Sequence, residues 1–222
     1  MNCVRAVLLV ALLALAGCNP GMEAMVRTLR GAALGEEAPG AARLDPSFRY
    51  LRVGAPGGTA FLALGYVETH PEGPVEIWYS GQREVLRLQN GRVVGAVGMA
   101  TEWRDVRLSE PPAWPALARA GEPYRWTRVR DLMPGYRFGV RDTLVLRPIA
   151  PPRASGLLGR DAASLAWFEE RLESSDAEAE VGLPPARYAV DLARNGEVVY
   201  GEQCLGAELC FTWQRWPPAV AR

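Results

Sequence analysis

The sequence predicts a mainly β fold, in which an antiparallel meander sheet forms a barrel-like or strongly curved single domain with a short N-terminal helix. From residue 48 onward, runs of apolar and aromatic residues alternate with turn signals at intervals of about 8–12 residues, as in antiparallel sheets. Asparagine-glycine pairs at 90–91 and 195–196 are typical of tight hairpin turns. Proline pairs at 111–112, 151–152 and 184–185 separate these runs and mark connections between strands.

The N-terminus has the pattern of a secretory signal peptide over residues 1–17. The stretch from Ala6 to Ala16 is wholly apolar and follows the single charge of Arg5. It is shorter than the roughly 20 residues that a membrane-spanning helix needs, so we expect it to be the hydrophobic core of the signal.

The residues at the end of this stretch, Leu15-Ala16-Gly17-Cys18, resemble the lipobox of bacterial lipoproteins. The resemblance implies that Cys18 is acylated and becomes the first residue of the mature chain. Asn19 stands where an aspartate would signal retention in the inner membrane, which favours the outer membrane, with the domain facing the periplasm. An ordinary signal peptide with an incidental cysteine is the alternative.

Residues 18–46 are expected to form a lipidated N-terminus with a short helix and a tether, and residues 47–222 the β domain. The helix is predicted because Met22, Met25, Val26 and Leu29 recur at helical spacing. The sequence leaves open whether residues 22–34 pack on the domain or lie on the membrane.

The alternation of apolar and polar residues, together with the turn residues between the runs, predicts the strands along the chain. The hairpin around residues 90–91 is the firmest, since asparagine and glycine both accept the positive φ angles of a type I′ turn. Residues 164–174 fit either a helix or a strand, and residues 111–120 are expected to add a helical turn or two. The predicted strands and hairpins span residues 48–53, 59–68, 75–80, 83–98, 122–133, 136–148 and 186–203.

Composition argues against a nucleic-acid partner. Removing residues 1–17 takes one arginine from 25 basic residues and leaves 24 against 25 acidic ones, a net charge of −1, whereas a nucleic-acid-binding domain carries a basic excess. Every basic residue is arginine. Cys204 and Cys210 flank a predicted turn and are expected to form a disulfide, as suits an oxidising compartment; two free thiols are the alternative.

Three blocks of sequence resemble the YjbF type of lipoproteins, the family that includes the group 4 capsule lipoprotein GfcB. They are "GQREVLRLQNGRVVGAVGM", "DLMPGYRFGV" and "ARYAVDLARNGEVVYGEQ", within a likeness over about residues 48–216. The resemblance implies a barrel-like β fold with a strand over residues 164–174, no established enzymatic activity, and genes encoded beside those for capsule or exopolysaccharide secretion. The Cys204/Cys210 pair and Ala189, where the family usually has a large aromatic residue, depart from the pattern.

Catalytic and metal sites are not expected, and no cofactor is predicted. His70 is the single histidine and lies in a predicted turn without a suitable serine or cysteine nearby. A zinc site would need several histidine or cysteine ligands. A glycosidase needs two carboxylates across a cleft, but the adjacent or closely spaced candidates are expected on solvated faces: Glu169 with Glu170, and Glu102 with Asp105.

An aromatic and arginine-rich set of residues is the remaining candidate site. Aromatic rings stack on sugars, and arginine binds carboxylate or phosphate groups through paired N–H donors. The alternative is that the aromatic residues fill the core while the arginines alternate outward, which the period-two spacing of Tyr124 and Trp126 favours. Pro134-Gly135 fits the centre of a type II turn. The candidate glycan or partner surface consists of Trp103, Arg104, Arg125, Trp126, Arg128, Tyr136 and Arg137.

These expectations describe an outer-membrane lipoprotein, held by a lipid anchor, that assists assembly or export of capsule or exopolysaccharide. It would bind and position export proteins or an acidic polysaccharide without breaking a bond. The alternatives are a polysaccharide-modifying enzyme with paired carboxylates and a structural envelope lipoprotein unrelated to glycans.

Overall fold

The fold is a single antiparallel meander of twelve strands. The computed structural model describes residues 44–176 and 182–218, so the predicted lipid anchor and N-terminal helix lie outside the described residues. The strands are β1 (Tyr50–Ala55), β2 (Gly58–Glu68), β3 (Val75–Tyr79), β4 (Val85–Gln89), β5 (Arg92–Val97), β6 (Glu102–Ser109), β7 (Tyr124–Met133), β8 (Arg137–Ile149), β9 (Ala166–Ser175), β10 (Ala186–Asp191), β11 (Glu197–Gly206) and β12 (Leu209–Trp216).

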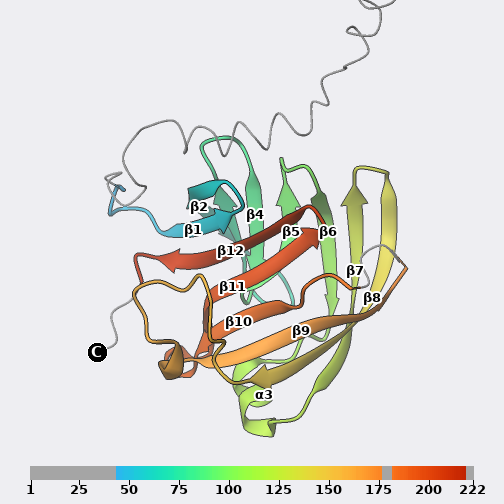
Figure 1. Cartoon of the computed structure of the whole chain (residues 1–222). Coiled ribbons are helices and arrows are strands. Elements are labelled where there is room, and N and C mark those ends of the chain that lie inside the picture. Colours follow the sequence, from blue (N-terminus) through green and yellow to red (C-terminus); the bar gives the residue numbers. More distant parts are fainter. Residues whose placement is uncertain (1–43, 177–181, 219–222) are drawn as a thin grey trace, which may run out of the picture.

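The sheet closes on itself because β1 pairs with both β2 and β12, which makes a closed barrel of twelve strands. In Figure 1, β9 to β12 cross the front of the molecule, while β4 to β7 stand upright behind them. The closed sheet is therefore flattened into two layers whose strands run in different directions. Its interior is filled by the large apolar cluster that includes Leu51, Leu88, Trp103, Phe168 and Trp213.

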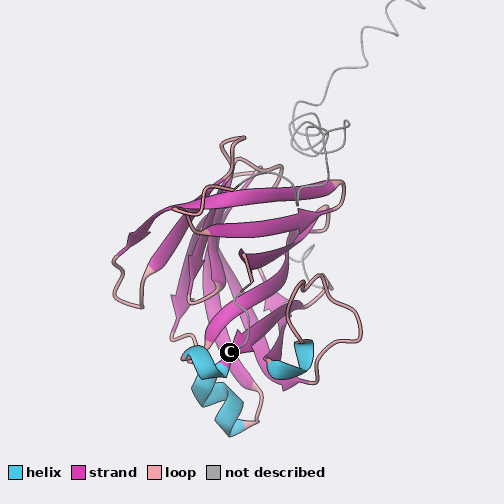
Figure 2. Cartoon of the chain, turned by 90° about the vertical axis from the view of Figure 1, so that its left-hand side faces the viewer, coloured by secondary structure: helices cyan, strands magenta, loops and turns pink. Residues whose placement is uncertain are grey.

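One α-helix occurs among the described residues, α3 (Trp114–Ala120), and it covers one end of the closed sheet (Figure 2). It begins with proline at its second position, a favoured site in the first turn, and ends at Gly121 with φ 68°. The Trp114 ring packs 5.2 Å from that of Phe168 and 5.0 Å from that of Tyr188. The helix thus lies in the predicted 111–120 segment.

Local turn chemistry explains the two asparagine-glycine hairpins. Asn90 and Gly91 have φ angles of 49° and 77°, as a type I′ turn requires. The second hairpin also turns at Asn195 and Gly196, with φ 58° and 77°. There a short 3-10 helix, η3 (Leu192–Arg194), precedes the pair and lengthens the loop. Residues 134–136 form a longer turn than predicted, because Tyr136 as well as Gly135 has a positive φ, 54° and 100°.

The connection between β8 and β9 packs against the outside of the sheet. It contains a second 3-10 helix, η1 (Ala162–Ser164). Leu165, Trp167 and Tyr200 form a separate small apolar cluster with residues of this connection. The ambiguous segment 164–174 is mostly strand β9, with Trp167 in this outer cluster and Phe168 in the interior one.

Candidate functional site

The seven residues predicted to form a glycan or partner surface do not share one surface. Trp103, Trp126 and Arg128 are buried, with exposed fractions of 1%, 5% and 8%. The other four are exposed: Arg104, Arg125, Tyr136 and Arg137. The prediction of a surface role is therefore wrong for the buried three, and the alternative reading of core packing applies to them.

Strand alternation is the reason for this division. Successive side chains of a strand point to opposite faces, and in β7 the buried residues are Trp126, Arg128, Arg130 and Leu132. The expectation that arginines alternate outward fails here, because these arginines have the same parity as the tryptophan. Arg125 has the opposite parity and lies in solvent.

The interior arginines of β7 share one carboxylate on β8. Arg128 donates from Nε to Asp142 Oδ2 at 2.7 Å, and Arg130 donates from Nε at 2.6 Å and from Nη2 to Oδ1 at 3.0 Å. Ser175 donates to the same carboxylate at 2.5 Å. Burial alone would raise the pKa of Asp142, but the two arginines and the serine outweigh it and hold the pKa below its ordinary value.

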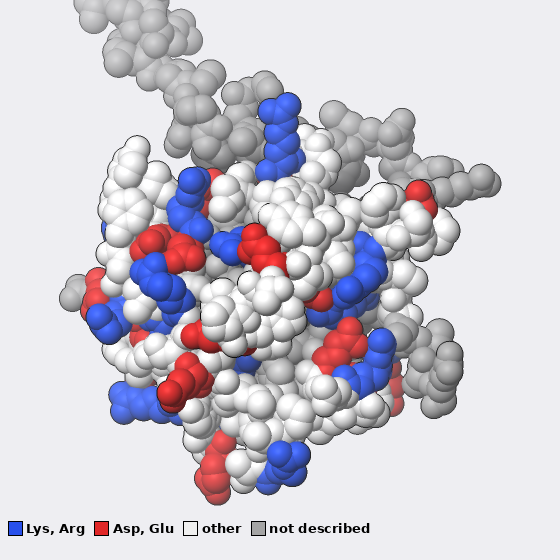
Figure 3. Space-filling view, turned by 180° about the vertical axis from the view of Figure 1, so that it is seen from behind, with Lys and Arg blue, Asp and Glu red and all other residues white. Residues whose placement is uncertain are grey.

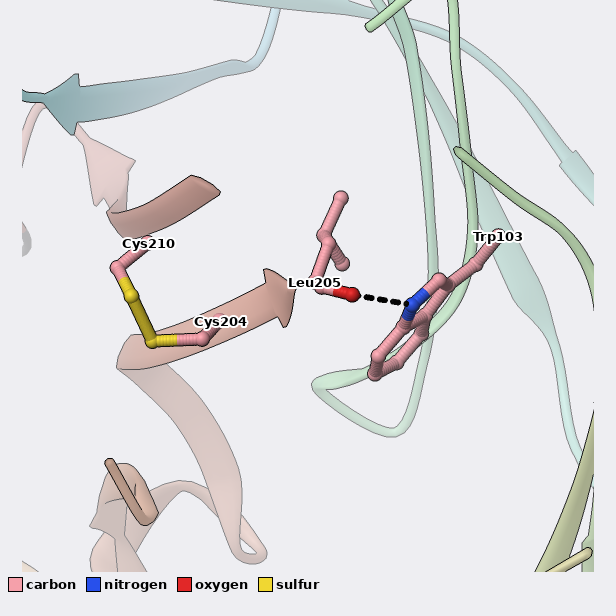
Figure 4. Close-up of a disulfide and its surroundings, with 4 residues drawn as sticks. All are labelled: Trp103, Cys204, Leu205 and Cys210. Atoms are coloured by element: carbon pink, nitrogen blue, oxygen red, sulfur yellow. Dashed lines mark hydrogen bonds between the residues drawn. A yellow bond between two sulfur atoms is a disulfide. The ribbon is translucent and has the colours of Figure 1, made fainter. Parts of the chain in front are cut away.

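Trp103 connects these arginines to the disulfide-bonded hairpin. The guanidinium carbons of Arg128 and Arg130 lie 4.5 and 4.6 Å from the centroid of its ring, within the range of cation–π attraction. Its indole Nε1 donates to the carbonyl of Leu205 at 3.0 Å (Figure 4). Leu205 follows Cys204, which forms a disulfide with Cys210 between the paired strands β11 and β12.

A second buried charged group lies toward the α3 end. Arg92 is 3% exposed, packs 4.0 Å from the ring centroid of Trp114 and donates to the carbonyl of Pro112 at 2.9 Å. Glu170 is 4% exposed and accepts from the Tyr188 hydroxyl at 3.5 Å. Burial raises the pKa of Glu170 above its ordinary value, although Arg128 and Arg92 partly oppose that shift.

The expectation that Glu169 and Glu170 lie on a solvated face is wrong, since both are buried. Glu169 is near the outer surface, where Arg147 and Arg171 each donate to it at 2.8 Å. Burial tends to raise the pKa of Glu169, but these two hydrogen bonds hold it below its ordinary value. Because the two carboxylates leave β9 on opposite faces, they cannot act on one bond.

Of the other predicted acidic pair, Asp105 lies at the surface as expected, whereas Glu102 is half-buried. The Glu102 carboxylate is 18% exposed and contacts Arg104 at 3.0 Å, and the Asp105 carboxylate is 44% exposed and contacts Arg107 at 2.6 Å. His70 is exposed in the β2–β3 turn, where its Nδ1 accepts from the backbone of Glu72 at 3.3 Å. Among residues 44–176 and 182–218, no three histidine, cysteine or acidic side chains are grouped to hold a metal ion.

The exposed members of the predicted surface occupy two places. Arg104 and Arg125 are on the wall of the sheet, near opposite ends of the β6–β7 pair, and contact Glu102 and Glu173. Tyr136 and Arg137 are at the tip of the β7–β8 hairpin. Seen from behind, basic and acidic side chains alternate over the molecular surface (Figure 3). This face therefore has no strongly basic area of the kind that attracts a polyanion over a distance.

The fold and its interior define the class of protein: a closed antiparallel β domain with arginines, carboxylates and tryptophans inside it. Known proteins share this class. The model of the family described as "Group 4 capsule polysaccharide lipoprotein gfcB, YjbF" matches residues 42–212. The chain belongs to this family. The match covers the described domain almost completely, so the family assignment from the three sequence blocks is confirmed.

A solved structure has the same fold. The crystal structure of the hypothetical lipoprotein YmcC from Escherichia coli K12 superposes with a TM-score of 0.55 at 21% sequence identity. The likeness covers 78% of this chain and 86% of that chain. Among curated proteins, none matches this chain. Within the described part of the chain, the helices lack the length and apolar character needed to cross a bilayer.

Proposed function

We propose that this protein is an outer-membrane lipoprotein, anchored through Cys18 and facing the periplasm, that assists assembly or export of capsule or exopolysaccharide. Its role is to bind and position other components, without catalysis. The observation that carries the proposal is the match of residues 42–212 to a family of capsule polysaccharide lipoproteins. A lipid anchor suits this role because confinement to one membrane raises the effective concentration near an export complex.

The surface chemistry favours export proteins over an acidic polymer as the direct partner. The exposed arginines on the wall, Arg104 and Arg125, already have carboxylate partners. Such exposed pairs are worth only about 0–1 kcal/mol, so they can exchange partners locally. Long-range attraction of a polyanion needs a net positive field, whereas the predicted mature chain has 24 basic and 25 acidic residues. We therefore propose that export proteins, and not the polymer itself, contact this wall.

The carboxylate pairs considered for an enzyme do not favour catalysis. Glu170 is enclosed in the interior, and Glu169 is hydrogen-bonded to arginines on the opposite face. Glu102 and Asp105 each contact an arginine at the surface. A glycosidase requires two carboxyl groups facing the same glycosidic bond, which the first pair cannot provide.

The test is the amount of polysaccharide at the cell surface and in the periplasm. Deleting the gene and replacing Cys18 by alanine should each lower the surface amount. An Arg104→Glu/Arg125→Glu double variant should do the same while remaining folded and anchored. Arg153→Glu, a charge reversal at another exposed arginine, is the matched control. Unchanged surface polysaccharide in the deletion strain would refute the proposed function.

A further inference from the structure

One end of the closed sheet lies opposite α3 and contains an apolar cleft, although charged residues such as Arg83 and Glu208 occur in the turns around it. Because the sheet is an antiparallel meander, the β1–β2, β3–β4, β5–β6, β7–β8 and β11–β12 turns lie at this end, toward the top of Figure 1, while α3 is at the bottom. The turn sequences at 55–58, "APGG", and at 98–101, "GMAT", carry no charge. We call this part of the molecule the turn end.

The turn end contains an apolar cleft of about 110 Å³. Its walls come from four of the turns and the adjoining strand ends, with Met99 from the β5–β6 turn and Phe211 from β12. This volume holds a single hydrophobic side chain or the end of an acyl chain, and is too small for a whole lipid. The apolar lining includes Val53, Ala60, Leu62, Leu86, Met99, Leu209 and Phe211.

The β7–β8 hairpin adds two exposed aromatic rings to the same end. Tyr136 is 74% exposed and Phe138 is 65% exposed, the highest values among the large hydrophobic residues described. A Cβ placed on the neighbouring Gly135 or Gly139 would meet no atom within 4 Å. The tip therefore projects from its own domain, and its two aromatic rings are largely exposed to solvent.

We propose that the turn end contacts the lipid bilayer that carries the anchor, with Tyr136 and Phe138 in the membrane interface. Tyrosine is enriched at that depth because it combines an apolar ring with a polar hydroxyl, and Phe138 adds a second apolar ring beside it. The inference rests on the proposed anchor at Cys18.

The tether length makes this contact feasible. Cys18 and Leu44 are separated by 25 residues, which can extend to at most about 80–90 Å. The domain is thus held within reach of the bilayer and can direct its turn end toward it. Two aromatic rings would bind a membrane weakly on their own, but tethering replaces a bimolecular encounter by an intramolecular one at high effective concentration.

The experiment uses the lipidated full-length mature protein in vesicles of phosphatidylethanolamine and phosphatidylglycerol at 3:1. Since Cys204 and Cys210 form a disulfide and Cys18 is proposed to carry lipid, an introduced cysteine is the free thiol for a nitroxide label. Labels are placed by Phe138→Cys at the tip and, as matched control, by Arg119→Cys on α3, an exposed position at the opposite end. Flotation with the vesicles is measured on the same samples.

For each nitroxide label we compare its accessibility to oxygen, which partitions into the bilayer, with its accessibility to a nickel chelate that stays in water. The ratio of the first to the second should be several-fold higher at position 138 than at position 119. A label at Met99→Cys should give an intermediate ratio, which falls to the aqueous value in a Tyr136→Ser/Phe138→Ser background. If the protein floats but position 138 reports water, the membrane contact is refuted while the anchor stands. If position 138 is shielded from both reagents, protein covers the tip, as contact with a second copy of the chain would, and the inference is overturned. Failure to float removes the anchor and the inference with it.

Discussion

The Asp142 carboxylate should be among the most important single groups for stability, because two buried arginines depend on it. It accepts three hydrogen bonds from Arg128 and Arg130, and neither its side chain nor that of Arg130 is exposed at all. Removing one partner of a buried ion pair costs about 3–5 kcal/mol, since the remaining charge stays buried without compensation. We therefore expect Asp142→Asn to lower the free energy of unfolding by at least about 3 kcal/mol.

Urea unfolding followed by tryptophan fluorescence provides the measurement, with the free energy taken by linear extrapolation. Asp105→Asn is the matched control, because the Asp105 side chain is 44% exposed and its pair with Arg107 lies at the surface. A pair of that kind is worth about 1 kcal/mol or less. If the two variants lose the same small amount, the buried network contributes little net stability and the reasoning fails.

The same variant has a predicted pH dependence. The pKa of Asp142 is held below its ordinary value of 3.8, so the folded state binds its proton less readily than the unfolded state. Its stabilising contribution is complete above about pH 3.8 and disappears as the pH falls through the lowered pKa. The difference in unfolding free energy between wild type and Asp142→Asn should therefore shrink in acid, and a constant difference would contradict this.

Three further changes test other parts of the molecule. Burial raises the pKa of Glu170 above its ordinary value of 4.5, so stability should fall as the pH rises above about 4.5, and Glu170→Gln should flatten that part of the stability profile. Replacing Cys204 and Cys210 by serine opens a loop with a sequence separation of 6, which should cost about 2 kcal/mol by chain entropy. Gly91→Ala should cost at least about 1 kcal/mol, because Gly91 has φ 77° and its added Cβ would overlap the side chain of Val198.

Each of these has its own control. Glu170→Gln should leave the loss of stability in acid in place, because that loss depends on carboxylates with lowered pKa values such as Asp142, Glu169 and Asp191. A stability profile unchanged over the whole pH range would contradict the assignment to Glu170. Reducing the wild-type disulfide should reproduce the loss seen in the serine variant. Gly121→Ala should be milder than Gly91→Ala, since its φ is 68° but no atom lies within 4 Å of the added Cβ.

Local signals predicted the parts of the fold that local chemistry determines. The Asn90-Gly91 turn follows from two residues that accept positive φ, and β9 follows from the family resemblance, since its apolar spacing alone also fits a helix. The prediction of a mainly β, strongly curved meander is confirmed. The closure between β1 and β12 has no local signal, because these strands are separated by more than 150 residues.

The interior charges were missed because hydropathy places arginine and glutamate outside. The usable signal was parity: Trp126, Arg128 and Arg130 are spaced by two, and a strand residue shares its face with the tryptophan two positions away. Parity would also have separated Glu169 from Glu170. It would still not have shown that Asp142, on the next strand, supplies the balancing charge, since that depends on the β7–β8 register.

Packing on the outside of the sheet also explains a departure from the family pattern. Ala189, which the sequence resemblance marks as a departure from an expected large aromatic residue, is fully buried. In the register it lies between Trp167 on β9 and Tyr200 on β11, whose ring centroids are 5.9 Å apart. A methyl group at position 189 lets these two rings meet across it under the β8–β9 connection. The aromatic volume is thus supplied by the neighbouring strands, and a large ring at 189 would overfill a site that is already closed.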